Sequence, residues 1–161
     1  MKILAIDPGT KQSGWCIYDG DCVLDSGVSL NEDVLFMIGR TELQISIVSI
    51  EMIASYGMAV GKEVFETCLW VGRFRQAWHS PEDVMLVYRK DVKMHLCGTL
   101  KAKDANIRQA IIDLFPAVGG GKTPQIGTKA LKGPLYGVSS HAWPALGVAI
   151  TVCASIKGKE L

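Results

Sequence analysis

Residues 1–20 read MKILAIDPGTKQSGWCIYDG, and this stretch predicts how the fold begins. The apolar run Lys2–Asp7 predicts a strand that ends at an Asp-Pro-Gly turn. A second apolar run, Gly14–Tyr18, is followed by Asp-Gly-Asp, a tripeptide typical of a tight turn between strands. Residues Cys22–Leu30 can then return as a third strand. We therefore expect the chain to open with an antiparallel meander.

The rest of the chain alternates between predicted strands and predicted helices. The run Leu43–Glu51 is rich in Ile and Val and predicts a buried strand, and Asp83–Tyr88 predicts another. Helices are expected over Glu32–Gly39 with Asn31 as its cap, Lys62–Trp78, a segment that starts at the basic residues 89–93, Asp104–Phe115 and roughly His141–Ile156. This alternation indicates an α/β fold with a mixed sheet flanked by helices.

Two further features of this pattern are specific enough to test. Within the helix Lys62–Trp78, the apolar side chains expected to face the core are Val64, Leu69, Val71 and Phe74. The stretch Gly119–Pro134 is rich in Gly, Lys, Thr and Pro and predicts a mobile loop.

Size and composition fit one globular domain. The chain has 161 residues, of which 48% are hydrophobic and 20% are charged, and this suits a single core. No secretory signal is expected, because the opening apolar run reaches Asp7 before a signal-length segment develops. The longest uncharged apolar stretch, Ala145–Ala154, is too short to span a bilayer. The five cysteines are odd in number and lack zinc-site spacing, so we expect reduced thiols in a cytoplasmic protein.

Charge is distributed unevenly along the chain, although the net charge is only +1. Residues 1–88 carry 6 Lys and Arg against 12 Asp and Glu, whereas residues 89–132 carry 9 against 3. An acidic part beside a basic surface supports a polyanionic partner such as nucleic acid. Ordinary solvated surface charge explains such a pattern about as well, so both interpretations stay open.

Two carboxylates stand at the ends of predicted strands. Asp7 faces an open turn, where it could hold a hard cation or serve only to form the turn. Glu51 closes the other strongly apolar strand, and burying an unpaired carboxylate is costly. If the two strands are neighbours, these groups converge and repel each other, and a divalent cation would remove the repulsion. His141, at the start of the last helix, is a candidate third ligand whose case depends on the other two.

The segment Gly-Gly-Gly-Lys-Thr at residues 119–123 resembles a nucleotide-binding P-loop but does not fit one. The pattern needs a Gly five residues before Gly121, where Pro116 stands, and a P-loop follows a strand rather than a helix. We therefore expect no nucleotide cofactor. A Gly/Lys loop that touches phosphates fits the segment better.

The order of several motifs resembles the RuvC-type Holliday-junction resolvases. The family's opening Asp-Pro-Gly-x-x-x-x-Gly matches residues 7–14, and its Glu at the end of the fourth strand matches Glu51. A Leu-x-x-Gly-Arg helix at 69–73 follows, and then a segment similar to the family's Val-Lys…Gly…Ala-x-Lys, here Val-Lys at 92–93, Gly98 and the adjacent Ala-Lys at 102–103. The family's terminal helix has an acid or His, two residues and Asp-Ala-Leu; here residues 141–146 read His-Ala-Trp-Pro-Ala-Leu. The phrase Gly-Pro-Leu-Tyr-Gly-Val before that helix resembles the phage-encoded branch.

The resemblance implies a ribonuclease H-like fold, with a mixed five-stranded sheet flanked by helices, over residues 1–161 as a single nuclease domain. It implies hydrolysis of DNA phosphodiesters at four-way junctions and related branched DNA by a homodimer, with two Mg²⁺ or Mn²⁺ ions. The implied ligands are Asp7, Glu51 and His141, and Lys103 would stabilise charge near the scissile phosphate. Because a His ligand suits Mn²⁺ better than Mg²⁺, we expect Mn²⁺ to support cleavage at least as well.

Other residues are assigned to contacts with DNA or with a second copy of the chain. The helix Lys62–Trp78 is the expected dimer contact, and Tyr56 or Phe65 either wedges into the junction or simply packs. The expected DNA-backbone contacts are Arg73, Lys90, Lys93, Lys101, Lys122, Lys129 and Lys132.

One residue departs from the family pattern. Pro144 stands where the family has its final Asp, and a proline cannot bind a metal. Proline is tolerated in the first turn of a helix, where we expect Ser140 to act as the cap. Either water or a hydroxyl completes the metal site, or the enzyme is weakened.

Two other function classes remain. The first is a non-catalytic protein that binds branched DNA and in which Pro144 records lost activity. The second is an actin-like or sugar-kinase ATP domain, which also opens with a strand, an Asp and Gly-Thr. That architecture needs two such domains, and this chain has room for one.

Overall fold

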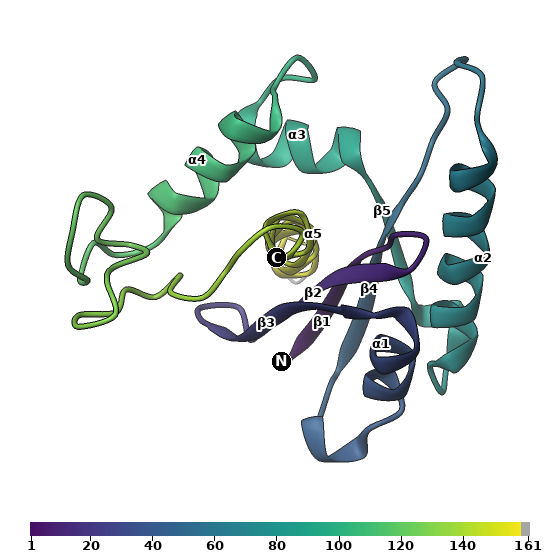
Figure 1. Cartoon of the computed structure of the whole chain (residues 1–161), viewed down its shortest axis with the longest axis horizontal. Coiled ribbons are helices and arrows are strands. Elements are labelled where there is room, and N and C mark those ends of the chain that lie inside the picture. Colours follow the sequence, from purple (N-terminus) through teal and green to yellow (C-terminus); the bar gives the residue numbers. More distant parts are fainter. Residues whose placement is uncertain (159–161) are drawn as a thin grey trace.

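The computed structural model describes residues 1–158, and these residues form a five-stranded sheet with helices on both faces (Figure 1). The strands are β1 (Ile3–Asp7), β2 (Gln12–Tyr18), β3 (Val23–Leu30), β4 (Ile47–Met52) and β5 (Met85–Tyr88). The helices are α1 (Asn31–Ile38), α2 (Lys62–Ala77), α3 (Arg89–Cys97), α4 (Asp104–Leu114) and α5 (Ala142–Lys157).

The sheet is mixed, with the strand order β3-β2-β1-β4-β5. The first three strands form the expected antiparallel meander, in which Asp7 at the end of β1 pairs with Gly14 of β2. β4 then pairs with β1 in parallel, with Ile6 opposite Ile50, and β5 pairs with β4 in parallel. Parallel neighbours need long crossover connections, and α2 lies in the connection between β4 and β5. The predicted mixed sheet is confirmed.

Alternate side chains of the central strands enter two separate cores. Leu4 and Ile6 of β1 belong to the core under α1 and α2, whereas Ile3 and Ala5 belong to the core under α5. Figure 1 shows α1 and α2 on one side of the sheet and α5 on the other, with α3 and α4 packed beyond α5. Because side chains alternate along a strand, Asp7 follows Ile3 and Ala5 onto the α5 face.

Two strands begin at least two residues later than the sequence predicted. β4 starts at Ile47 rather than Leu43, because its partner β1 only begins at Ile3 and gives the earlier residues no ladder to join. Residues Thr41–Leu43 instead form a 3₁₀ turn. A second 3₁₀ turn, Pro81–Asp83, delays β5 to Met85.

The two predicted helix caps were wrong. α1 begins at Asn31 itself, and the Asn31 side chain makes no cap hydrogen bond because it bonds to Ser13 and Gly9 instead. α5 begins at Ala142, after His141 in the cap position, and Ser140 has left-handed backbone with φ of 44°. Tertiary contacts and a preceding turn replace the local caps that the sequence suggested.

The prediction of one core residue of α2 was also wrong. Val71 and Phe74 are buried as predicted, but Leu69 is 70% exposed. Thr67 takes a buried position instead, and its hydroxyl donates to the carbonyl of Glu63. The apolar stripe of α2 is therefore narrower than the sequence indicated.

The segment Gly119–Pro134 is a loop, as predicted, but backbone hydrogen bonds tie it together. The Gly119 amide donates to the Pro124 carbonyl, and the Gly133 amide donates to the Ile126 carbonyl. Leu135, just beyond the loop, is fully buried. This bonding argues against the mobility that its composition suggested. In Figure 1 the loop lies on the opposite side of α5 from α2.

Residues 1–158 bear on the predictions about membrane spans and cysteines. None of the helices in this range is long and apolar enough to cross a membrane. The cysteines are free thiols, as expected. Burial raises the pKa of the Cys16 thiol to about 12, which is typical of a buried and unreactive cysteine.

Candidate functional site

Asp7 and Glu51 lie side by side at one edge of the sheet. Asp7 is the last residue of β1, and Glu51 follows Ile50, which pairs in parallel with Ile6. Both side chains face α5 and are largely buried, with exposed fractions of 19% and 13%. The carboxyl ends of parallel strands are where loops and helix starts open a site above a sheet.

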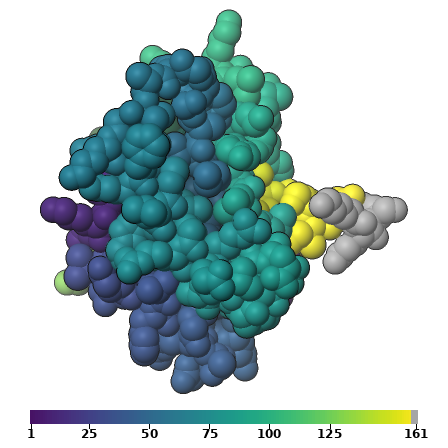
Figure 2. Space-filling model, turned by 90° about the vertical axis from the view of Figure 1, so that its right-hand side faces the viewer, coloured from purple at the N-terminus to yellow at the C-terminus, as the bar shows by residue number. Residues whose placement is uncertain are grey.

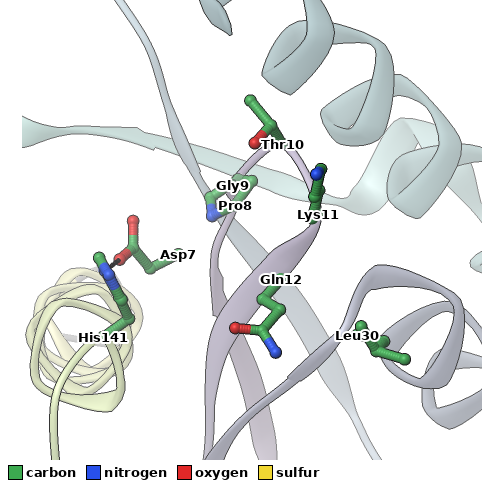
Figure 3. A pocket seen from close by; sticks show the side chains of 8 residues that line it. All are labelled: Asp7, Pro8, Gly9, Thr10, Lys11, Gln12, Leu30 and His141. Atoms are coloured by element: carbon green, nitrogen blue, oxygen red, sulfur yellow. Dashed lines mark hydrogen bonds and ion pairs between the residues drawn. The ribbon is translucent and has the colours of Figure 1, made fainter.

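His141 reaches this edge from a distant part of the chain. Its Nδ1 lies 3.2 Å from Oδ2 of Asp7, and Figure 3 shows the imidazole directed at the carboxylate. The His141 side chain is 69% exposed, so the contact lies at the surface of the site. The last residue of β1 and the residue before α5 therefore meet, although 134 positions separate them.

The turn after Asp7 is held by a small buried network that the sequence did not reveal. The Ser13 hydroxyl donates to the Asn31 side-chain oxygen at 2.6 Å, and the Asn31 amide donates to the Gly9 carbonyl at 2.9 Å. The Gly9 amide in turn donates to Ser13 Oγ at 3.3 Å. Ser13 and Asn31 are 1% and 0% exposed. Buried hydrogen bonds of this kind fix the turn and so the direction of Asp7.

Glu51 has a second neighbour, Arg89, which the sequence also failed to identify. Arg89 Nη1 lies 3.7 Å from Glu51 Oε1, and Arg89 Nη2 donates to the Asp104 carboxylate. The remaining oxygen of Glu51 and Nη1 of Arg89 are buried without a hydrogen-bond partner. Its position in the sequence was the one available signal for a place at the site, because Arg89 directly follows β5 just as Asp7 ends β1.

The electrostatics of the pair oppose two bare negative charges. Burial raises the pKa of Glu51 to about 7, the nearby Asp7 carboxylate adds to the rise, and Arg89 opposes it. Burial also raises the pKa of Asp7, against the lowering effect of its hydrogen bond and charge interaction with His141. Positive charge at this edge would therefore stabilise the ionised forms of both groups.

Solved structures match this arrangement of strands and helices. No protein-family model and no curated protein matches the chain in sequence. The structure of Thermus thermophilus RuvC matches with a TM-score of 0.70 and 16% identity, over 98% of this chain and 97% of that chain. T. thermophilus RuvC in complex with a Holliday junction substrate matches with a TM-score of 0.69 and 15% identity, over 98% and 96%. The chain has a RuvC-like fold.

At this level of identity, the likeness establishes the fold alone. The ribonuclease H-like sheet expected from the sequence is confirmed. Within residues 1–158 no three His, Cys, Asp or Glu side chains gather closely enough to hold a metal ion by themselves. Asp7 and His141 touch, while the nearest charged partner of Glu51 is Arg89.

The donors on this edge of the RuvC-like fold nevertheless suit a divalent cation. Asp7 and Glu51 offer carboxylate oxygens, and His141 offers an imidazole nitrogen, a set that Mn²⁺ accepts. The unpartnered buried oxygen of Glu51 is a free ligand position. A cation would also offset the burial and the repulsion from Asp7 that raise the pKa of Glu51.

Pro144 is the third residue of α5 and lies in its first turn, as the sequence predicted. It lines a hollow with Arg89, Asp104 and His141, so the position is at the site but offers no ligand atom. His141 also lines a second hollow, which follows the Asp-Pro-Gly turn and is the one drawn in Figure 3.

The basic residues assigned to DNA lie on several elements of the RuvC-like fold. Lys103 precedes α4 and is followed by Asp104, whose carboxylate accepts from Arg89. Arg73 of α2 lines a hollow with Thr10 and Lys11, and Lys93 lines another with Tyr56. The exposed members of the set are Arg73, Lys90, Lys101, Lys103, Lys122, Lys129 and Lys132.

Proposed function

We propose that this protein is a divalent-metal-dependent endonuclease that cuts four-way DNA junctions and related branched DNA. The observation that carries the proposal is the contact of Asp7 with His141, beside Glu51, at the carboxyl edge of a RuvC-like sheet. One of the matching RuvC structures holds a Holliday junction substrate, which supports the choice of branched DNA.

Asp7, Glu51 and His141 would hold Mg²⁺ or Mn²⁺ at this edge. The metal would supply the Lewis acidity that phosphodiester hydrolysis needs. The protein's own contribution is placement, because the Asn31–Ser13 network fixes the turn after Asp7, and α5 carries His141 to it. Fixed ligands of this kind avoid reorganisation during the reaction.

Lys103 would stabilise the negative charge that develops on the reacting phosphate. Its place before α4 supports this role, because the next residue, Asp104, bonds to Arg89 at the site. The other basic residues would follow the DNA backbone through phosphate contacts. Binding should then weaken steeply as salt concentration rises.

A homodimer is part of the proposal, with α2 as the contact. Phe65 and Leu69 are 61% and 70% exposed and stand four residues apart, so they share one face of the helix. Figure 2 views the molecule from the side on which α2 lies. Exposed apolar side chains of this kind are typical of protein–protein contacts. Two copies related by a two-fold axis would present two sites to a four-way junction.

The proposed setting is the cytoplasm, of a bacterial host if the protein is phage-encoded. The phrase Gly-Pro-Leu-Tyr-Gly-Val, residues 133–138, supports the phage assignment through its resemblance to that branch. Leu135, within this phrase, is fully buried in the core that α5 covers.

A second candidate function rests on Pro144. A proline at this position removes one acidic ligand that the family pattern places there, which favours a protein that binds branched DNA without cutting it. Both candidates share the same DNA surface and differ only in cleavage.

A nicking assay on a synthetic four-way junction with Mn²⁺ separates them. We expect the wild type to nick the junction, Asp7→Asn to abolish nicking while retaining junction binding, and Asp113→Asn to behave like the wild type. Asp113 is a matched control because it is an exposed aspartate of α4 that bonds only to Gln109 of its own helix. Tight junction binding without nicking by the wild type would support the non-cutting alternative.

A further inference from the structure

The Arg89 guanidinium contacts two carboxylates at the candidate site. Its Nη1 lies 3.7 Å from Glu51 Oε1, and its Nη2 donates to Asp104. Only 24% of the Arg89 side chain is exposed, and the residue follows β5 directly. Since β4 lies between β1 and β5, Arg89 stands on the β5 side of Glu51 and Asp7 on its β1 side. The fold therefore places a permanent positive charge at one end of the site.

Burial lowers the pKa of Arg89, but Glu51 and Asp104 outweigh this effect and hold it above its ordinary value. The guanidinium is thus charged at any pH at which the protein would work. Its position matches that of a counter-ion for Glu51. A divalent cation on the same side of Glu51 would face this charge at close range and be repelled.

The summed charge of the side chains at the site also favours one divalent cation over two. When all three are ionised, as metal binding requires, Asp7, Glu51 and Asp104 carry three negative charges, and Arg89 carries one positive charge, which leaves a net charge of −2. One divalent cation neutralises this set when His141 is a neutral ligand. A second cation would leave a net charge of +2, and Pro144 removes the additional acid that could offset it.

We infer that Arg89 takes the place of a second cation, so that each site binds one divalent cation, between Asp7 and His141 with Glu51 beside it. The inference rests on the proposed metal-dependent function. Asp104 is a positioning residue in this arrangement, because it accepts from Nη2 of the guanidinium while Nη1 lies near Glu51.

Counting bound Mn²⁺ on metal-stripped protein tests this inference without any activity measurement. The stoichiometry can be obtained by calorimetric titration and by electron paramagnetic resonance of free Mn²⁺. The variants are Arg89→Gln, Arg89→Lys and Arg108→Gln. Arg108 is a matched control, because it lines the same hollow as Arg89 but stacks over Trp143, 4.8 Å from the ring centre.

The wild type, Arg89→Lys and Arg108→Gln should each bind one Mn²⁺ per chain. Arg89→Gln should gain a second Mn²⁺ site, with at least tenfold higher affinity than any second binding by the wild type. Two wild-type sites of similar affinity would overturn the inference, as would a single site in a folded Arg89→Gln. Circular dichroism checks folding, and two wild-type sites of similar affinity would overturn the inference even if Arg89→Gln does not fold.

This experiment also separates the inference from the proposed function. If the wild type binds one Mn²⁺ and Arg89→Gln binds two, but neither nicks a junction, the inference stands and the nuclease proposal fails. If the wild type nicks the junction with two bound Mn²⁺, the nuclease proposal stands and Arg89 has another role. Absence of any Mn²⁺ binding would overturn both.

Discussion

The start of α5 rests directly on Gly14 of β2, because a Cβ at this position would lie 2.0 Å from the carbonyl oxygen of His141. Gly14 is also the residue that pairs with Asp7 across the β1–β2 hairpin. One glycine therefore lets His141 approach closely enough to meet the Asp7 carboxylate at 3.2 Å.

Gly14→Ala should push the start of α5 away from the sheet and separate His141 from Asp7. We expect a loss of about 1–3 kcal/mol in the free energy of unfolding, typical of overpacking, together with weaker Mn²⁺ binding. Urea denaturation and Mn²⁺ titration measure the two effects. Gly72→Ala is the control: nothing lies within 4 Å of its added Cβ, so it should stabilise α2 by up to about 1 kcal/mol. Equal stability and metal affinity of Gly14→Ala and the wild type would contradict this prediction.

Glu51 should make the metal-free protein less stable as pH rises. Its pKa is raised from 4.5 to about 7 in the folded state, so between these values the folded protein holds more protons than the unfolded chain. The free energy of unfolding therefore falls as pH rises through this window and is flat above it. Glu51→Gln should remove its part of the fall, worth up to about 3 kcal/mol between pH 4 and pH 8, and leave the part that the raised pKa of Asp7 contributes.

Urea denaturation in a chelator at the two pH values measures this effect of Glu51. Glu63→Gln, at an exposed glutamate of α2, should retain the wild-type pH dependence. A Glu51→Gln variant that loses stability with pH as steeply as the wild type would count against a buried, destabilised carboxylate at this position.

His141 should set the choice between Mn²⁺ and Mg²⁺. An imidazole ligand favours Mn²⁺ over Mg²⁺, whereas carboxylate ligands suit both ions. We expect the wild type to nick a four-way junction at least as fast in Mn²⁺ as in Mg²⁺, and His141→Asp to shift the ratio of the two rates toward Mg²⁺. Clearly faster wild-type turnover in Mg²⁺ would argue against His141 as a ligand.

Lys103 and Lys101 should have separable effects, although only one residue lies between them. Lys103→Ala should slow single-turnover cleavage by about 100-fold with little change in junction affinity, as for the loss of a group that stabilises transition-state charge. Lys101→Ala should weaken binding at all salt concentrations and reduce the salt slope by about 1, as for one lost phosphate contact. Gel-shift titrations over a salt series and single-turnover assays at saturating protein distinguish them. The same effect from both substitutions would contradict the separate roles.

Local patterns were sufficient for the strands and helices and for part of the site. The apolar runs that end at Asp7 and at Glu51 predicted two strands whose ends carry acids, and the sheet brings those ends together. Their strand character is local, because it depends on alternation and on β-branched residues over a few positions. The start of β4 at Ile47 was missed because pairing depends on where β1 begins.

The sequence did not reveal the residues whose partners lie far away along the chain. Asn31 was expected to cap a helix and instead braces the turn after Asp7, since Ser13 and Gly9 lie within hydrogen-bonding distance only in the folded sheet. Arg89 gave no signal beyond its place after β5, and its partner Asp104 lies 15 residues further along the chain.

The sequence by itself determined the succession of strands and helices, the apolar runs that carry Asp7 and Glu51, and the absence of an acid at position 144, because each follows from neighbouring residues. Only the tertiary structure decided that His141 touches Asp7 and that Arg89 stands beside Glu51. Those contacts join segments up to 134 residues apart, and they form because α5 and β5 pack into one sheet-and-helix core. Hydrophobic packing determines which strand ends and helix starts meet, and no local pattern of charges specifies those contacts.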